Sequence, residues 1–289
     1  DRFRELVQVR RRTAELKGYD NYARYSFEAV YGRDYTLQDA EGLCSDVKTR
    51  IVPLNNDIWY MDVAQESYDS LDLVEESSAQ DILAGVGRAV GSVSPELGEI
   101  FRYMQDNELY DIQSGEDGQD RMDNNYTVGL PSYGDAFIFI NRNHTFTDYQ
   151  SLIHEFGHFS SYYYNSVPEL FQGYSVDVCE VQSQGLEMLA NQYAEDMFGE
   201  GAEAFEFETV TDMLYVIIMS CMLQEFEEAV YMDPDMSLED MNRTFKEIQD
   251  SYHGWYFDVY DEGVCYDWVD VSHLFYSSLY YMGYGTSAL

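Results

Sequence analysis

The sequence predicts a mainly α-helical protein with one small β-sheet placed just before a long central helix. Apolar residues recur at helical spacing over most of the chain, whereas strand-like patterns are confined to residues 109–140. No internal repeat and no low-complexity tract interrupts this organisation. With 289 residues, the chain is long enough to bury a substantial core.

Helical patterns dominate the first part of the chain. An amphipathic period runs from Arg2 to Leu16, and further patterns cover Leu37–Val52, Ala79–Val93 and Pro95–Asp106. Ser94 is the expected N-cap of the last of these helices. Pro95 fits its first position, because the N–H that proline lacks has no partner there.

The pattern changes to short strands after residue 107. Strands are expected over Leu109–Ile112, Tyr126–Leu130 and Ala136–Ile140, with a polar loop over residues 113–125 and a turn over residues 131–135. A helix is expected to resume near Thr147, with Thr147 or Asp148 as its cap, and helices continue to the end of the chain.

Acidic residues dominate the charge. Asp and Glu number 54 against 16 Lys and Arg, which gives a formal net charge of −38. Such a surface repels nucleic acid and anionic lipid, because phosphate binding needs clustered Lys and Arg. The longest mostly apolar run, Met213–Leu223, is shorter than the roughly 20 residues that a bilayer requires. We therefore expect no nucleic-acid partner and no membrane insertion, and the oligomeric state stays open.

The cysteines predict neither a zinc knuckle nor a dense disulfide framework, because they are far apart and form no CxxC pair. They are Cys44, Cys179, Cys221 and Cys265. Their even number permits two disulfides without requiring them. Of the isolated histidines, His144 is expected in a loop and His253 beside Trp255.

One segment carries a motif with a chemical meaning. Residues 151–159 contain HExxH as His154, Glu155 and His158. Residues four apart share a helix face, so both imidazoles can bind one ion, and zinc accepts neutral His nitrogens. Glu155 can reach a water at the metal and act as its general base. Two unpaired histidines on a helix with apolar flanks would be costly, so we expect one Zn2+ ion here.

The third ligand decides the class of zinc site. The metzincin extension needs Gly at 161 and His at 164, where this sequence has Ser161 and Tyr164. A glutamate on a following helix is the other common solution. Glu180 and Glu187 lie two turns apart, so one could bind the metal while the other orients a ligand histidine. On spacing alone, both could also be surface acids of a very acidic chain.

The sequence HEFGH followed by E-x-x-S-Q-x-x-E, over residues 154–158 and 180–187, resembles the thimet oligopeptidase, neurolysin and oligoendopeptidase F family of zinc metallopeptidases. The bacterial oligoendopeptidase F members are the most similar. The resemblance implies a neurolysin-like zincin catalytic domain, of the gluzincin type, with Glu180 as the third zinc ligand and Glu187 as the residue that supports the ligand shell.

Nearly all of the chain takes part in this resemblance. It implies that residues 1–289 are a catalytic-domain segment of a longer chain, without the N-terminal half and the extreme C-terminus of the family. Familiar bacterial members are cytoplasmic, and we expect the same here. An extracytoplasmic location stays open, because a missing N-terminus could have carried a signal.

The strand candidate over residues 136–140 is similar to an edge strand that lies beside the metal in this family. In zinc peptidases of this type, such an edge pairs with the backbone of an extended substrate. The resemblance therefore implies that Ala136, Phe137 and Ile138 bind substrate. An ordinary hydrophobic strand packed in a small sheet is the alternative for each of these residues.

A segment near the C-terminus, residues 272–284, resembles the family's His-and-Tyr segment. There a histidine and tyrosines donate hydrogen bonds to the tetrahedral oxyanion of the reaction. By position, these roles would belong to His273, Tyr281 and Tyr284, with Tyr280 as the rival for Tyr281.

Taken together, the motifs predict a zinc endopeptidase that hydrolyses internal bonds of short oligopeptides, with Glu155 as the general base acting on a metal-activated water. One alternative is a zinc exopeptidase of dipeptidase or carboxypeptidase type. Another is an inactive segment that holds zinc and peptides without turnover. A purely structural zinc site is disfavoured, because such sites are usually closed by four Cys or His ligands.

Overall fold

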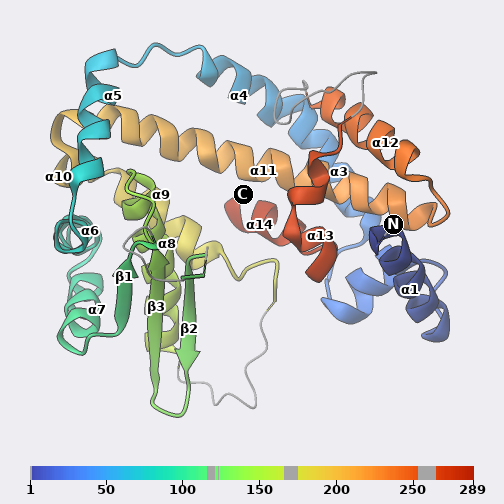
Figure 1. The fold of residues 1–289 in the computed structure, drawn as a ribbon, viewed down its shortest axis with the longest axis horizontal. Coiled ribbons are helices and arrows are strands. Elements are labelled where there is room, and N and C mark those ends of the chain that lie inside the picture. The colour runs from blue at the N-terminus through green and yellow to red at the C-terminus, as the bar shows by residue number, and fades with distance from the viewer. Residues whose placement is uncertain (1, 116–120, 123, 166–174, 253–264) are drawn as a thin grey trace. The chain divides into compact units, whose positions relative to one another are not determined.

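A computed structural model describes residues 2–115, 121–122, 124–165, 175–252 and 265–289. The described part is mostly helical with one small β-sheet, which confirms the predicted fold class. The chain divides into two compact units, which are described separately (Figure 1). A single catalytic domain over residues 1–289 stays a prediction.

The first unit comprises residues 1–60, 174–179 and 214–289. Its hydrophobic core is rich in aromatic residues, including Phe27, Phe226, Phe245 and Trp268. Its elements are α1 (Arg2–Leu16), α2 (Tyr22–Tyr25), a π-helical turn (Ser26–Val30), α3 (Leu37–Asp46), a second π-helical turn (Val47–Ile51), α4 (Val52–Trp59), the second part of α11 (Ala202–Met232), α12 (Leu238–Ser251), a 3-10 turn (Asp267–Asp270), α13 (Ser272–Tyr276) and α14 (Met282–Ala288).

The predicted helix over Leu37–Val52 differs from the structure in one respect. A π-helical turn over Val47–Ile51 separates α3 from α4. Pro53 lies in the first turn of α4. Since proline has no N–H to donate, it interrupts the regular i to i−4 ladder, and the wider turn before it accommodates the break.

The second unit comprises residues 61–173 and 180–213. Its elements are α5 (Gln65–Asp72), a 3-10 turn (Leu73–Glu76), α6 (Ala79–Val93), α7 (Pro95–Asp106), β1 (Tyr110–Gln113), β2 (Tyr126–Leu130), β3 (Asp135–Asn141), α8 (Thr147–Tyr164), α9 (Val181–Asn191), α10 (Ala194–Phe198), a 3-10 turn (Gly199–Gly201) and the first part of α11. Helices α6 and α7 have the predicted bounds. Ser94 caps α7 as predicted, with its side chain accepting a hydrogen bond from the N–H of Glu96.

The sheet has the order β1-β3-β2, with β1 parallel and β2 antiparallel to β3 (Figure 1). The predicted edge position of Ala136–Ile140 is therefore wrong, because this strand pairs on both sides. Ile138 lies opposite Tyr110 on one neighbour and Thr127 on the other. Among the described strands, β2 is an outer strand. Strand order depends on pairing between distant segments, which the local pattern does not encode.

Helix α8 lies at the centre of the core of the second unit. Its residues Leu152, Ile153, Phe156 and Phe159 are buried together with Ala136, Ile138 and Ile140 of β3 and with residues of α6 and α7. Burying each large apolar side chain contributes about 1.5–3 kcal/mol. The helix that carries HExxH is thus anchored by its apolar face, which fixes the direction of its polar face.

The start of α8 corrects the predicted cap. The helix begins at Thr147, but its N-cap residue is Phe146, and no side chain caps it. Asp148 is buried and forms an ion pair with Arg142, with 3.2 Å between Oδ2 and Nε. The two oxygens of Asp148 also accept hydrogen bonds from the N–H groups of Asn143 and His144, so Asp148 orders the preceding loop instead.

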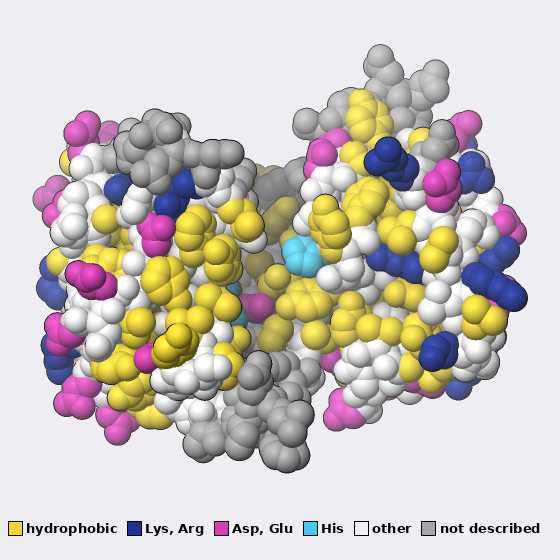
Figure 2. All heavy atoms as spheres, turned by 60° about the horizontal axis from the view of Figure 1, so that its bottom comes forward, with side chains coloured by type: hydrophobic (Ala, Val, Ile, Leu, Met, Phe, Trp, Pro, Cys, Tyr) yellow, Lys and Arg dark blue, Asp and Glu magenta, His cyan; other side chains and the backbone are white. Residues whose placement is uncertain are grey.

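On the face drawn in Figure 2, acidic side chains are scattered among hydrophobic and uncharged ones rather than gathered in one patch. None of the described helices combines the length and apolar character that a bilayer-spanning segment needs. The four cysteines are present as thiols.

Replacing Ser78 tests whether the capping box at the N-terminus of α6 stabilises the protein. Ser78 Oγ accepts a hydrogen bond from the N–H of Asp81, and the Asp81 carboxylate accepts one from the N–H of Ser78. Ser78→Ala should lower the free energy of unfolding by about 1 kcal/mol, because the N–H of Asp81 loses its acceptor, while the N–H of residue 78 can still donate to the Asp81 carboxylate. Urea unfolding measures this change. Gln80→Ala, at an exposed position of the same helix, should leave the free energy within about 0.5 kcal/mol of the parent, and equal effects of both variants would contradict the capping role.

Candidate metal centre

Helix α8 presents the two motif histidines on one face. The rings of His154 and His158 have centroids 5.0 Å apart. Their side chains are 27% and 20% exposed, while the apolar residues around them are buried. The helical spacing predicted from the motif is therefore present, with both imidazoles at the boundary between the core and solvent.

Glu180 lies between the two imidazoles. Its Oε2 is 3.2 Å from Nε2 of His154 and 3.1 Å from Nε2 of His158. Glu180 is the N-cap residue of α9. The two-turn spacing to Glu187 predicts a position inside the helix, so the structure differs from that prediction. Its position at the helix start lets the carboxylate turn toward α8.

These three residues fit a metal ion. Their ligand atoms all lie within 4.8 Å of one another, in a group of two imidazoles and one carboxylate. Tetrahedral zinc with bonds of about 2.0–2.1 Å would separate its ligands by about 3.3 Å. The distances from the Glu180 oxygen to the two ring nitrogens are close to this value, so small adjustments would admit an ion.

A glycine inside the motif explains how α9 comes so close to α8. A Cβ atom at Gly157 would lie 2.5 Å from Cα of Ser183 and 2.7 Å from the carbonyl oxygen of Gln182. Real Cβ atoms essentially never approach so closely, so the two helices meet backbone to backbone at this residue. This role is not among the predictions made from the sequence, and the small residue between the two histidines is the signal that could have indicated it.

Glu187 orients the first histidine. Its Oε1 lies 2.6 Å from Nδ1 of His154, and Gln150 Nε2 donates to its other oxygen at 3.3 Å. A bond at Nδ1 holds the ring so that Nε2 faces Glu180, the arrangement that supports metal-binding histidines in general. This contact favours the supporting role expected for Glu187, which stays a prediction, and Gln150 is a further contact that the sequence pattern does not indicate.

The charges of the cluster favour a cation. Burial lowers the pKa of His154, but hydrogen bonds to Glu180 and Glu187 outweigh this effect and raise the pKa to about 10. Burial raises the pKa of the Glu180 carboxyl, but its bonds to the two histidines outweigh it, so this pKa lies well below its ordinary value. Carboxylates thus surround the two rings, and a divalent cation bound to Nε2 and Oε2 would offset their charge.

Glu155 is held by the neighbouring strand. Thr127 of β2 places its hydroxyl 2.7 Å from Oε2 and 2.8 Å from the backbone carbonyl oxygen of Glu155. Glu155 is only 6% exposed. Burial raises the pKa of its carboxyl above the ordinary value, although His154 and the Thr127 hydroxyl oppose this. A raised pKa makes the carboxylate a stronger proton acceptor, which suits a general base. The sequence analysis missed Thr127, which lies 28 residues away in the chain.

The remaining candidates form a second group in the first unit. Tyr280 stacks on the ring of His273 at 5.5 Å between centroids, and the Tyr281 ring lies edge-on to it at 5.3 Å. The hydroxyl of Tyr284 is 3.5 Å from Nε2 of His273. All three tyrosine rings thus lie beside His273, so these contacts do not decide between Tyr281 and its rival Tyr280, and the oxyanion roles stay predictions.

The proposed substrate-binding strand needs a correction. Ala136 and Ile138 are buried in the core, and Phe137 pairs with Val128 across the sheet. Because β3 is the central strand, the pairing with substrate expected for Ala136, Phe137 and Ile138 as an edge strand does not fit.

His144 does not belong to either of these groups. His144 precedes α8 in the loop ordered by Asp148, with a φ of 61°. His253 and Trp255 lie outside the described residues.

Solved structures share this fold. A chain assigned as an oligoendopeptidase F superposes with a TM-score of 0.81 and 26% sequence identity, over 99% of this chain and 53% of its own length. The chain is oligoendopeptidase F-like. A structure of PZ peptidase A with an inhibitor superposes with a TM-score of 0.80 and 24% identity, over 99% of this chain and 54% of that one.

A third structure, assigned as an oligoendopeptidase F from Bacillus anthracis str. Ames, gives a TM-score of 0.75 and 23% identity, over 99% of this chain and 51% of that one. The oligoendopeptidase F-like chain thus spans about half the length of these proteins. No protein-family model and no curated protein matches the sequence.

Gly157→Ala tests the close approach of the two helices. The added methyl group must push α9 away from α8, so we expect a loss of about 1–3 kcal/mol in the free energy of unfolding and a weaker affinity for Zn2+. Chemical unfolding and zinc titration measure the two effects. Gly185→Ala, on α9 with nothing within 4 Å of the added Cβ, should retain zinc affinity and leave stability unchanged or improved. Parental zinc affinity in Gly157→Ala would contradict the account.

Glu187→Gln tests the orientation of His154. Without the carboxylate at Nδ1, we expect the affinity for Zn2+ to fall about 10- to 100-fold. Competition with a chromophoric chelator measures it. Glu195→Gln, which removes an exposed charge from α10, is the matched control and should bind Zn2+ as the parent does. The orienting role fails if both variants bind equally well.

Proposed function

We propose that the protein is a zinc-dependent endopeptidase that hydrolyses internal bonds of short oligopeptides. The observation that carries the proposal is the convergence of His154, His158 and Glu180 beside a buried Glu155. The same fold occurs in proteins assigned as oligoendopeptidase F and in PZ peptidase A. A site of three protein ligands, two histidines and one carboxylate, is typical of catalytic zinc, because a position stays open for water or substrate.

The residues of this site have two roles, metal binding and proton transfer. Zn2+ held by His154, His158 and Glu180 would polarise the scissile carbonyl and lower the pKa of the attacking water. Glu155 accepts the proton of that water and passes it to the leaving amine. Thr127 holds the Glu155 carboxylate, and Glu187 holds the ring of His154, so both groups are oriented before the substrate arrives.

We assign stabilisation of the oxyanion to the second group. His273 and the hydroxyl of Tyr284 or Tyr281 are hydrogen-bond donors of the kind that this step needs. Their close packing supports the assignment, since the Tyr284 hydroxyl lies 3.5 Å from Nε2 of His273 and the Tyr280 ring stacks on the same imidazole.

An extended peptide would pair with β2 rather than with β3. This strand is an outer strand of the described sheet and packs directly on α8, where a Cβ at Gly129 would lie 2.7 Å from the ring of Tyr162. Its residue Thr127 also contacts Glu155. Pairing at this edge would place a substrate backbone next to the proton acceptor and would depend little on side-chain identity.

Glu155→Gln tests the reaction directly. The variant keeps the shape of the side chain but cannot accept the proton, so kcat should fall by about 10²- to 10⁴-fold while one Zn2+ remains bound. Cleavage of an internally quenched peptide blocked at both ends, together with metal analysis, measures both. The matched control Glu195→Gln should cleave at the parental rate.

The same assay separates the alternatives. Cleavage of peptides only when one end is unblocked would favour a zinc exopeptidase. Stoichiometric zinc without cleavage by the parent would favour a segment that binds zinc and peptide without turnover. Equal kcat for the parent and Glu155→Gln would contradict Glu155 as the general base.

A further inference from the structure

The link between α13 and α14 contains a residue in an unusual backbone conformation. Leu279 has a φ of 61°, which lies in the left-handed region that residues other than glycine rarely adopt. Its side chain is completely buried. Such a conformation persists only where the surroundings hold it in place.

Two buried side chains, a glutamate and an arginine, hold the backbone of Leu279. Its N–H donates to Oε2 of Glu227 on α11 at 2.7 Å, and Nη2 of Arg33 donates to its carbonyl oxygen at 2.9 Å. Glu227 is 1% exposed and the Arg33 side chain is fully buried. The bond from Arg33 has a charged donor, and such hydrogen bonds are shorter and stronger than neutral ones. Together the two bonds fix the peptide units on both sides of the Leu279 Cα atom.

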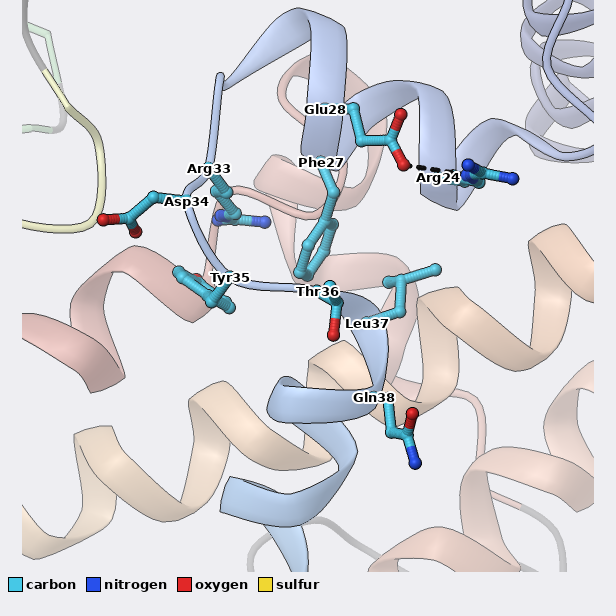
Figure 3. Close-up of a pocket in the computed structure, with 9 residues that line it drawn as sticks. All are labelled: Arg24, Phe27, Glu28, Arg33, Asp34, Tyr35, Thr36, Leu37 and Gln38. Atoms are coloured by element: carbon cyan, nitrogen blue, oxygen red, sulfur yellow. Dashed lines mark hydrogen bonds and ion pairs between the residues drawn. The ribbon is translucent and has the colours of Figure 1, made fainter.

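Arg33 is itself fixed from several sides. Its Nε donates to Asp177 at 2.9 Å, and its guanidinium carbon lies 4.3 Å from the centre of the Phe27 ring, beside which it is seen in Figure 3. The hydroxyl of Tyr31, whose ring also faces Arg33 at 4.9 Å, donates to the carbonyl oxygen of Ser278 at 2.9 Å. Arg33, Glu227 and Tyr31 therefore hold two consecutive peptide units of the link. The contacts of Arg33 and Glu227 with Leu279 are called the clamp below.

Asp177, which pairs with Arg33, also contacts α14. The carbonyl oxygen of Asp177 accepts hydrogen bonds from the hydroxyls of Thr286 and Ser287 at 3.1 and 3.2 Å. A Cβ at Gly283 would lie 2.4 Å from the carbonyl oxygen of Val176, so α14 packs against this segment through its backbone. Arg33 and Asp177 thus tie the link to the helix that follows it.

The clamped link connects the residues of the proposed oxyanion group. His273 lies on α13, and Tyr280, Tyr281 and Tyr284 follow Leu279 directly or on the first turn of α14. The conformation of Leu279 sets the direction in which the chain leaves one helix and enters the next. It therefore sets how the tyrosine rings face the imidazole.

We propose that Arg33 and Glu227 are positioning residues that clamp Leu279 and so hold His273 against Tyr280 and Tyr284. This inference rests on the proposed function for its catalytic consequence. Neither residue touches the reacting atoms; both act through the backbone of the link. A role in stability alone explains the cluster less well, because buried ionic groups often contribute no more stability than apolar residues of similar volume.

Four variants test the clamp. Glu227→Met and Arg33→Met each remove one contact to Leu279, and Glu227→Gln keeps an oxygen that can accept from Leu279. Glu225→Gln is the matched control, because Glu225 lies two residues away on α11 and pairs with Lys48 instead. In the zinc-loaded protein we expect both Met variants to lose about 10- to 100-fold in kcat with KM and zinc affinity unchanged, since displacement of a catalytic group by about 1 Å can cost about 100-fold. Glu227→Gln should restore kcat to within about threefold of the parent.

Backbone amide hydrogen exchange gives a second measurement, which does not depend on peptidase activity. Exchange over residues 274–284, followed by mass spectrometry, should be at least about tenfold faster in the Met variants and parental in Glu225→Gln. A parent without peptidase activity would overturn the proposed function, and the exchange rates would still decide whether the clamp exists. Parental exchange and parental kcat in both Met variants would overturn the clamp, and so would a rise in KM alone.

If the Met variants fail to fold, the kcat of Arg33→Lys decides whether the clamp exists. Lysine can keep the charge beside Asp177 but has no planar fork to reach Leu279 as well. A reduced kcat at parental KM supports the clamp, and a parental kcat overturns it.

Discussion

The backbone contact between α8 and α9 at Gly157 is the constraint on which the proposed metal centre depends. Because no Cβ stands between the helices, Glu180 at the start of α9 comes within 3.1–3.2 Å of both imidazole nitrogens. The same approach brings Glu187, further along α9, to the other nitrogen of His154. A wider spacing would remove the third ligand and its support together, since metal bonds to carboxylates are only about 2.0–2.2 Å long.

The hydrophobic core supplies the rigidity that this contact needs. Phe156 and Phe159 on α8 are buried against other aromatic and aliphatic residues of the second unit, so the polar face of the helix has a fixed direction. The sheet adds β2, which brings Thr127 to Glu155. The proposed metal ligands, the proposed proton acceptor and the residues that contact them therefore belong to one packed unit, as precise chemistry requires.

Local signals explain what the sequence could predict. Helix α7 was placed correctly because Ser94 and Pro95 mark its start, and the HExxH spacing places both histidines on one face of a helix without further information. The central position of β3, the contact at Gly157 and the bond from Thr127 were not predictable in this way. Each depends on segments that are distant in the chain and meet only in the folded structure. The buried pair of Arg33 and Glu227 was missed for the same reason.

Anomalous diffraction at the zinc absorption edge, from crystals of the zinc-loaded protein, tests the central claim most directly. The account predicts one anomalous peak about 2.0–2.1 Å from Nε2 of His154 and of His158, with an oxygen of Glu180 at a similar distance. A zinc peak bound by other residues, or no peak at these three side chains, would contradict it.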